Sequence, residues 1–552
     1  MSAALLEITG LQVALPKGAD RPLALDTIDL VVGANEIVCL VGESGSGKSL
    51  TAGAVMRLLP EPHVRVVGGS IRFEGQELPA LSERQMRDLR GSKIAMIFQE
   101  PMTALNPQKT VGWQIDEVLR VHTNLSRKQR RARIQDILEQ VQIPDPLSAI
   151  NAYPHQISGG QRQRVMIAMA LVLEPRLIIA DEPTTALDVT TQKQILHLIR
   201  DMQRRLGTGV LFITHDFGVV AEIADRVAVL RHGVMVEQGP ASDILNNPQH
   251  PYTKSLIASV PALTPPAPKQ LDGAAEVLRV GNLRKTFPAR GGFLGFGRKA
   301  VEAVKDVSFS LYEGETLGIV GESGSGKSTV SRCVTKLVKS DSGEISLGDV
   351  DILRASSREM RALRPRIQMI FQDPMASLNP RRRVIDLVTQ GPIAHGVSRA
   401  EAEKRGHELL ELVGLSSATA ERFPHEFSGG QRQRIGIARA LAMRPKVLVA
   451  DEPVSALDVS VQAQVLALLV DLRERFSLSL LFVTHDLRVA AQLCDRIAVM
   501  QRGEIVECGP TAEVFASPKH PYTRDLLSAI PGRDWTPPVT AVPAPEGADV
   551  TK

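Results

Sequence analysis

Cysteines, aromatic residues and long apolar runs are all scarce in this 552-residue sequence, and each scarcity narrows what it can encode. The four cysteines form no CxxC pair and have no zinc-ligand spacing, so we expect inert thiols in a reducing compartment. Apolar stretches such as residues 167–173 stop well short of the roughly 18 residues that a membrane helix needs. Any membrane-spanning part of the function must therefore come from other chains.

The sequence also lacks a large excess of charge of either sign. Lys plus Arg number 65 and Asp plus Glu number 61, and a net charge of +4 is too small at this length to indicate a nucleic-acid partner. The first residues have no basic segment followed by an apolar core, so we expect no signal peptide. Length and ordinary composition predict a soluble globular protein of two to four domains.

A glycine-rich stretch organises the chain. It follows a strand-like apolar run at 37–41, precedes a helix-like run at 50–59, and reads Gly42, Glu43, Ser44, Gly45, Ser46, Gly47, Lys48 and Ser49. Glycines let successive backbone N–H groups turn inward as an anion-binding nest, and the helix directs its positive end at the same phosphates. Lys48 would neutralise the β- and γ-phosphates, and Ser49 would complete Mg²⁺ coordination. The stretch predicts a P-loop that binds nucleotide.

The P-loop occurs twice. The same eight residues recur as Gly321, Glu322, Ser323, Gly324, Ser325, Gly326, Lys327 and Ser328. The offset between the copies is 279 at the P-loop lysines, 273 at Gln99 and Gln372, and a constant 270 from Ser158 onward. A repeat of this length predicts two homologous domains rather than a solenoid. We expect domains at 1–260 and 276–531, a proline-rich linker at 261–275 and a disordered tail at 532–552.

Each half alternates apolar strand-like runs with helical patterns, which predicts an α/β fold around a mainly parallel sheet, with a helical insert before Ser158. Two buried strands end in paired acids, Asp181-Glu182 and Asp451-Glu452. Acids at the carboxyl ends of parallel strands suit a Mg²⁺ partner and a base that activates water. Two further stretches begin buried helices with a serine cap and read Ser158, Gly159, Gly160, Gln161 and Ser428, Gly429, Gly430, Gln431.

Together with His215 and His485, these motifs resemble the ATP-binding-cassette (ABC) ATPases over nearly the whole chain, twice. The resemblance implies tandem cassettes, each with a helical and an antiparallel β subdomain, that hydrolyse ATP with Mg²⁺. It implies a head-to-tail sandwich in which Lys48 shares its ATP with Ser428–Gln431, and Lys327 shares its ATP with Ser158–Gln161. Its implied roles are catalytic bases (Glu182, Glu452), switch histidines (His215, His485) and metal-site residues (Ser49, Gln99, Asp181, Ser328, Gln372, Asp451).

Narrower features are similar to peptide-importer ATPases. These are the extensions after Gln99 and Gln372 and the repeated His-Pro-Tyr-Thr at 250–253 and 520–523. Two cassettes in one chain resemble the fused ATPases of dipeptide, oligopeptide, glutathione and microcin C importers. The resemblance implies two transmembrane permeases, an extracytoplasmic solute-binding protein as an indirect partner, and a peripheral place on the cytoplasmic face of the bacterial inner membrane. We expect no nucleic-acid partner and no iron–sulfur cluster. The alternative is a soluble tandem ABC ATPase that acts on ribosomes or DNA.

The two halves differ beside their P-loops. Phe287 stands where the resemblance implies an aromatic ring stacked on adenine, whereas the first half has Leu15 there. The residue after the P-loop serine is Leu50 in the first half and Thr329, a further hydroxyl near the phosphates, in the second. Loss of a base stack costs on the order of 1 kcal/mol. We therefore expect weaker nucleotide affinity at the Lys48 site.

Overall fold

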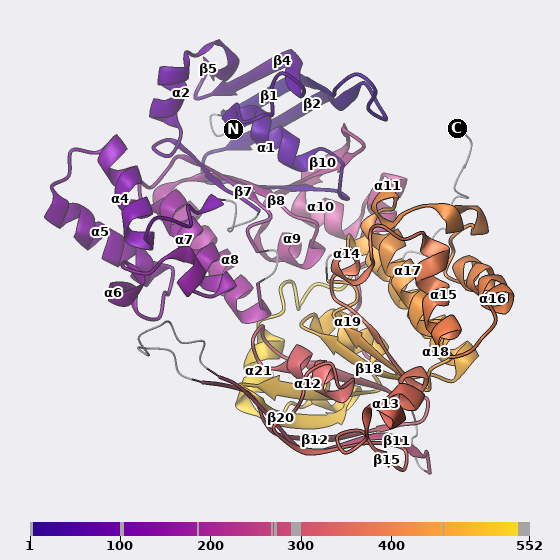
Figure 1. Ribbon diagram of the computed structural model, residues 1–552. Helices are drawn as coiled ribbons and strands as arrows, with labels where there is room; N and C mark the ends of the chain where they lie inside the picture. Colours follow the sequence, from indigo (N-terminus) through magenta and orange to yellow (C-terminus); the bar gives the residue numbers. More distant parts are fainter. Residues whose placement is uncertain are drawn as a thin grey trace. The chain divides into compact units, whose positions relative to one another are not determined.

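The structure is a computed structural model that describes residues 4–99, 104–184, 187–266, 269, 273–288, 300–455 and 457–538. Among these, the residues up to Val260 and those from Ile530 onward form one unit, and those from Pro261 to Ala529 form the other (Figure 1). Each unit contains one P-loop, so the duplication in the sequence corresponds to two separately folded bodies.

A six-stranded sheet with the order β10-β9-β3-β8-β7-β6 forms the centre of the first unit. Neighbouring strands are parallel except at β10, which pairs antiparallel with β9. All residues of β3, β7 and β8 are buried, as expected for continuous apolar runs between two helical layers. The strands are β3 (Ile37–Val41), β6 (Ile94–Ile97), β7 (Leu177–Asp181), β8 (Gly209–Ile213), β9 (Arg226–Arg231) and β10 (Val234–Pro240).

A second, antiparallel sheet of the first unit has the order β2-β1-β4-β5, with β1 (Ala4–Ala14), β2 (Leu23–Gly33), β4 (Arg65–Phe73) and β5 (Gln76–Glu77). Helices α4 (Val111–His122), α5 (Arg127–Gln140), α6 (Pro146–Ala149) and α7 (Gly159–Leu171) gather beside the sheets as a helical subdomain (Figure 1). The other helices are α1 (Lys48–Met56), α2 (Glu83–Leu89), α8 (Val189–Leu206), α9 (Phe217–Ile223), α10 (Ala241–Asn246) and α11 (Pro251–Ala258).

The second unit repeats this plan. Its six-stranded sheet, in the order β16-β17-β18-β13-β19-β20, comprises β13 (Thr316–Val320), β16 (Ile367–Ile370), β17 (Val447–Asp451), β18 (Ser479–Thr484), β19 (Arg496–Gln501) and β20 (Glu504–Pro510). The antiparallel sheet comprises β11 (Glu276–Phe287), β12 (Val301–Tyr312), β14 (Ser342–Leu347) and β15 (Val350–Asp351). The helices are α12 (Lys327–Val334), α13 (Ser357–Leu363), α14 (Pro374–Ser377), α15 (Val384–Ala394), α16 (Arg399–Leu412), α17 (Gly429–Leu441), α18 (Val459–Phe476), α19 (Leu487–Leu493), α20 (Thr511–Ala516) and α21 (Pro521–Ser528). The predicted fold class, two α/β cassettes with helical and antiparallel β subdomains, is confirmed.

The end of the described chain belongs to the first unit. Residues 531–534 form a turn, and the Gly532 amide donates to Glu222 Oε2 on α9 (3.2 Å). The tail that we predict at 532–552 begins within this turn, and its residues 539–552 lie outside the described part. Within the described ranges, no helix combines the length and the apolar character that crossing a membrane requires.

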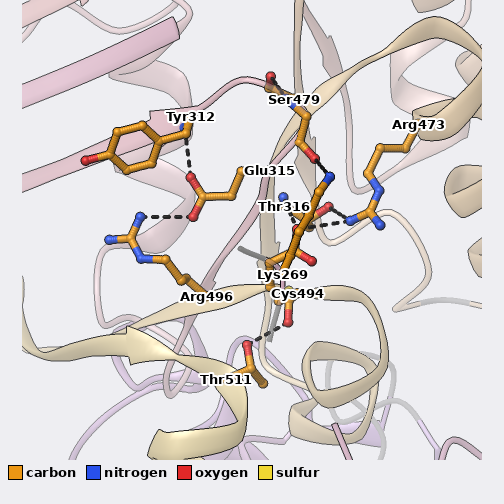
Figure 2. A network of polar contacts seen from close by, with 11 residues as sticks. Lys269, Tyr312, Glu315, Thr316, Arg473, Ser479, Cys494, Arg496 and Thr511 are labelled. Atoms are coloured by element: carbon orange, nitrogen blue, oxygen red, sulfur yellow. Dashed lines mark hydrogen bonds and ion pairs between the residues drawn. The ribbon is translucent and has the colours of Figure 1, made fainter. Parts of the chain in front are cut away.

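A polar network holds the start of β13, the strand that leads to the second P-loop (Figure 2). The fully buried Glu315 accepts from the Tyr312 amide (2.8 Å) and from Arg496 Nη1 (2.9 Å). Burial raises the pKa of Glu315, and the hydrogen bonds and the Arg496 charge oppose that rise. Arg473 donates to the Thr316 hydroxyl (2.8 Å). The strand is thus fixed at its amino end, and its carboxyl end delivers the P-loop.

Candidate functional site

Both P-loops adopt a conformation that only glycine tolerates. Gly42 has a φ of 152°, and a Cβ at this position would lie 2.1 Å from the carbonyl oxygen of Leu230. The corresponding Cβ at Gly321 would lie 2.2 Å from the Met500 carbonyl oxygen. Backbone therefore approaches backbone more closely than any side chain permits. The loop closes into a nest at the N-terminus of α1, and of α12 in the second unit.

The P-loop lysines are buried under their own loops. Lys48 Nζ donates to the carbonyl oxygens of Gly42 (2.8 Å) and Glu43 (2.9 Å), and it is 6% exposed. Lys327 donates to the equivalent carbonyls, both at 2.8 Å. A buried ammonium needs acceptors, and these carbonyls supply them. Each lysine is thus held at the mouth of the nest that its own loop forms.

The hydroxyl and the acid expected at a metal site lie together in both units. Ser49 Oγ donates to Asp181 Oδ1 at 3.0 Å, and Ser328 Oγ donates to Asp451 Oδ1 at 2.8 Å. Burial raises the pKa of Asp181, and the Ser49 hydrogen bond and the Lys48 charge act against it. The pKa of Asp451 is also raised, again chiefly by burial. A carboxylate and a hydroxyl side by side are hard oxygen donors, and donors of this kind suit Mg²⁺.

The three remaining chemistry-bearing side chains meet at the end of β7. Glu182 accepts from Gln99 Nε2 (2.9 Å) through one carboxylate oxygen and contacts His215 Nδ1 (3.1 Å) through the other. In the second unit, Glu452 accepts from Gln372 Nε2 (2.8 Å) and pairs with His485 Nδ1 (3.2 Å). The sequence motifs that predict a base, a switch histidine and a glutamine are therefore brought into one cluster twice.

The pairing changes the titration of these groups. Burial acts to lower the pKa of His215, but its hydrogen bond to Glu182 and the charge of that carboxylate outweigh burial, so the pKa is raised. The pKa of His485 is raised for the same reason by Glu452. Burial acts to raise the pKa of Glu452, but the His485 hydrogen bond and charge leave it lowered. An ionised carboxylate at neutral pH can accept a proton.

The serine-capped stretches begin α7 and α17. Ser158 Oγ accepts from the Gln161 amide (3.2 Å), and the Gln161 side chain accepts from the Ser158 amide (3.0 Å), which forms a capping box. Ser428 and Gln431 form the same box. Ser158, Gly159, Ser428 and Gly429 are all exposed, so both helix N-termini are accessible to a ligand.

Strand register places Leu15 at the position of Phe287. Thr286 pairs with Glu302 and Phe287 with Val301, while Ala14 pairs with Leu23 and the Leu15 amide donates to Pro22. The Phe287 ring is 41% exposed at the end of β11. Leu15 instead packs against the apolar core of the first unit. Thr329 follows Ser328 on α12 and carries a hydroxyl that its counterpart in the first unit, Leu50, does not have.

The structure adds a residue that the motif analysis did not place in the site. Tyr252 belongs to the repeated His-Pro-Tyr-Thr, and its hydroxyl accepts from the Glu43 amide of the P-loop (3.2 Å). Tyr522 accepts from the Glu322 amide (3.1 Å). The constant offset of 270 between the two tetrapeptides was the available signal, but sequence spacing does not reveal which loop a distant tyrosine touches.

A second such residue links the serine-capped helix to the base. Gln163, on α7, is buried and donates from Nε2 to the carbonyl oxygen of Pro183 (2.6 Å), the residue that follows Glu182. This hydrogen bond ties α7 to the backbone next to the proposed base. In the sequence, Gln163 is one polar residue within a helical stretch, and nothing marks its partner.

Two family profiles match the sequence of this chain. The profile described as "ABC transporter" matches residues 25–185 and again residues 304–455. A second profile, "Oligopeptide/dipeptide transporter, C-terminal region", matches residues 236–286 and 506–545. The first covers both P-loops and both paired acids, and the second covers both His-Pro-Tyr-Thr stretches.

Relatives described as glutathione import ATP-binding proteins match over almost the whole chain. The glutathione import ATP-binding protein GsiA of Escherichia coli (strain K12) is 48% identical over 562 residues, which covers 95% of this chain and 89% of the relative. The protein of the same description from Pectobacterium atrosepticum is 47% identical over 559 residues, with 96% and 90% covered. Among solved structures, the dimeric ATP-binding cassette MJ0796 bound to ADP and Pi is 31% identical with a TM-score of 0.39, and it covers 42% of this chain and 98% of its own.

Proposed function

The chain belongs to the ABC transporter family of ATP-binding proteins, and on that basis we propose that it is the ATP-hydrolysing, energy-coupling subunit of a bacterial importer for short peptides. One observation supports the ATPase part most strongly. Each of the two units gathers a P-loop lysine, a serine–aspartate pair and a glutamate–histidine–glutamine cluster at the end of its parallel sheet.

The residues support the following chemistry. The P-loop amides and Lys48 hold the phosphates, and Ser49, Asp181 and Gln99 provide oxygen donors that would hold Mg²⁺, which neutralises phosphate charge. Glu182 takes a proton from the attacking water as that water's oxygen bonds to the γ-phosphorus. The bond from that phosphorus to the β–γ bridging oxygen breaks, and ADP leaves with the electron pair. His215, which pairs with Glu182, would contact the γ-phosphate.

We propose that the two units share nucleotides, as the exposed helix N-termini of α7 and α17 suggest. ATP at Lys48 would be closed by Ser428–Gln431, and ATP at Lys327 by Ser158–Gln161. Closing and reopening this sandwich would move two membrane-spanning permeases, and Gln99 and Gln372 would relay the state of the site to them. The chain would then work as a peripheral subunit on the cytoplasmic face of the membrane.

The cargo class is inferred from the relatives. GsiA is described as a glutathione import protein, and the C-terminal profile is that of oligopeptide and dipeptide transporters. We therefore propose that peptides of about glutathione's size, delivered by an extracytoplasmic binding protein, are imported. The peptide-transporter profile, matched twice, favours this function over action on ribosomes or DNA.

Uptake and co-purification test the proposal together. Chromosomal deletion should abolish uptake of labelled glutathione or of short peptides, and the parent chain should restore it, whereas Glu182→Gln with Glu452→Gln should not. Affinity-tagged chain should bring two hydrophobic permeases from solubilised membranes. Recovery of ribosomes or nucleic acid from the soluble fraction, with uptake unchanged by the deletion, would refute the importer.

A further inference from the structure

The first unit has an arginine where the second unit exposes an aromatic ring. Arg21 lies in the loop between β1 and β2, and its Nη2 donates to the carbonyl oxygen of Gly45 in the P-loop (2.8 Å). Leu15, the counterpart of Phe287, packs on the core and offers no flat face beside the loop. Arg21 thus contacts the first P-loop from the strand end at which the second unit carries Phe287.

Strand register fixes this correspondence. The Leu15 amide donates to the Pro22 carbonyl (3.0 Å), so Arg21 is the first residue beyond the point where the two strands close. With the offset of 279 that aligns the P-loops, Arg21 corresponds to Ala300, which has no side chain able to reach a nucleotide. Among the described residues at this strand end, the first unit has the guanidinium of Arg21 and the second has the phenyl ring of Phe287.

The hydrogen bond of Arg21 to the P-loop holds one edge of its guanidinium. A guanidinium has five N–H donors in one plane. Arg21 Nη2 uses one of them on Gly45, whereas Nε is shielded from solvent and has no acceptor among the described residues. The bond to the P-loop restrains one edge of the plane, and a restrained planar cation is well suited to stack on an aromatic base.

We propose that Arg21 replaces the aromatic ring at the first nucleotide site and stacks on the adenine of ATP bound at the Lys48 P-loop. The proposal rests on the proposed function, in which both P-loops bind ATP. It refines the expectation of weaker binding at this site: removing the aromatic ring weakens the first site, and Arg21 restores part of the loss.

Single-site titration tests the role of Arg21. In a Lys327→Ala background, where the first site alone binds, Arg21→Ala should raise the Kd for MgATP about three- to tenfold. Arg21→Lys should lose as much, because an ammonium has no planar face. Tripolyphosphate, which has no base, should bind equally to all three chains. The matched control is Arg21→Ala in a Lys48→Ala background, where the second-site Kd should not change and where Phe287→Ala should raise it.

Three outcomes would overturn the role of Arg21. They are an unchanged Kd in Arg21→Ala, full retention of affinity in Arg21→Lys, and a loss of tripolyphosphate binding that equals the loss of ATP binding. The last two would indicate a charge contact with phosphate rather than a base stack. Failure of the underlying function looks different: the Lys48→Ala, Lys327→Ala double variant would then bind MgATP as tightly as the parent.

Discussion

Glu182 and Glu452 have an unusual backbone for the residues that we propose as bases. Their φ angles are 45° and 47°, in the left-handed region that non-glycine residues rarely occupy. Conformations of this kind persist where the surrounding structure enforces them, and they concentrate at functional sites. Here the strained residue is the one whose carboxylate meets both the glutamine and the histidine. The strain is thus consistent with a carboxylate whose direction matters.

Neutralising these two carboxylates tests their role. Glu182→Gln and Glu452→Gln keep the shape of the side chain but cannot accept a proton, so MgATP should still bind while hydrolysis falls. We expect each single variant to lose at least about half of the steady-state ATPase rate, and the double variant to lose about 100-fold or more. Glu174→Gln is a matched control, since Glu174 also has a positive φ (52°) but pairs with Arg133 outside the site. A single variant with the full rate would contradict two competent sites.

The histidine–glutamate pair predicts a pH dependence of stability. The raised pKa of His485 means that its contribution is complete below the unfolded value of about 6.5 and is lost as pH rises through the folded pKa. The lowered pKa of Glu452 means that its contribution is present above about 4.3 and is lost as pH falls through the folded pKa. The pair should therefore stabilise the second unit most between about pH 4.3 and 6.5.

His485→Gln makes this measurable. The fall in Tm relative to the parent should be largest near pH 5.5 and should shrink above the raised histidine pKa. His197→Gln is the control. The His197 side chain is 79% exposed, and its ion pair with the exposed Asp201 (3.6 Å) is screened by solvent. A difference in Tm that is the same from pH 5 to pH 9 would show that the histidine contributes packing and not charge.

Among the secondary-structure elements, α11 and α21 connect the peptide-transporter C-terminal region to the nucleotide site. His250 caps α11 by accepting from the Tyr252 amide (3.2 Å), which sets the tyrosine in the first turn. The Tyr252 hydroxyl then accepts from the Glu43 amide and donates to the Glu43 carboxylate (3.3 Å). Burial is the main cause that raises the pKa of Tyr252, so the hydroxyl keeps its proton. The element positions the first turn of the P-loop without entering it.

Tyr252→Phe and Tyr522→Phe remove this support. Each leaves a P-loop amide without its acceptor, at a cost of order 1 kcal/mol, so we expect the KM for ATP to rise about two- to fivefold with little change in kcat. Tyr312→Phe is the control, because Tyr312 stands near the start of β13, at the end opposite the P-loop. An unchanged KM in the double variant would show that the tyrosine hydroxyls do not support the P-loops and that the rings only pack.

How far the sequence predicted these elements depended on the range of the interactions. Motifs with fixed local spacing, such as residues 42–49 and Asp181-Glu182, predicted their strands, turns and helices because the chemistry lies within one βα turn. The approach of Gln99 and His215 to Glu182 followed from the resemblance, not from spacing. Contacts between distant segments, such as Arg21 with Gly45, depend on loop conformation and side-chain reach. No periodicity in the sequence encodes them.

For the whole molecule, the central expectation is that each ATP lies between the P-loop of one unit and the serine-capped helix of the other. The cap serines can be substituted to test this within one chain. They are exposed in both units, and each serine hydroxyl accepts from the backbone amide of the glutamine in its own cap, Gln161 or Gln431. Two cassettes in one chain also raise the local concentration of each for the other, so the closed state needs no second chain.

Crossed substitutions decide which P-loop each cap serves. In a Glu182→Gln, Glu452→Gln background that retains ATP, Ser428→Arg should block trapping of a photoreactive ATP analogue on the first cassette, because a bulky cation replaces the cap at the proposed site. Ser158→Arg should block trapping on the second. A protease site introduced within residues 261–275 separates the labelled halves for counting.

The cap of α5 provides the control for this experiment. Ser126 makes the same capping box with Gln129 in the same helical subdomain, so Ser126→Arg should disturb a helix start without changing either label. The crossed pattern follows only if each nucleotide touches both cassettes. Loss of label on the same cassette that carries the arginine would mean that each cassette closes on its own ATP, and the shared-site account of this transporter subunit would have to be abandoned.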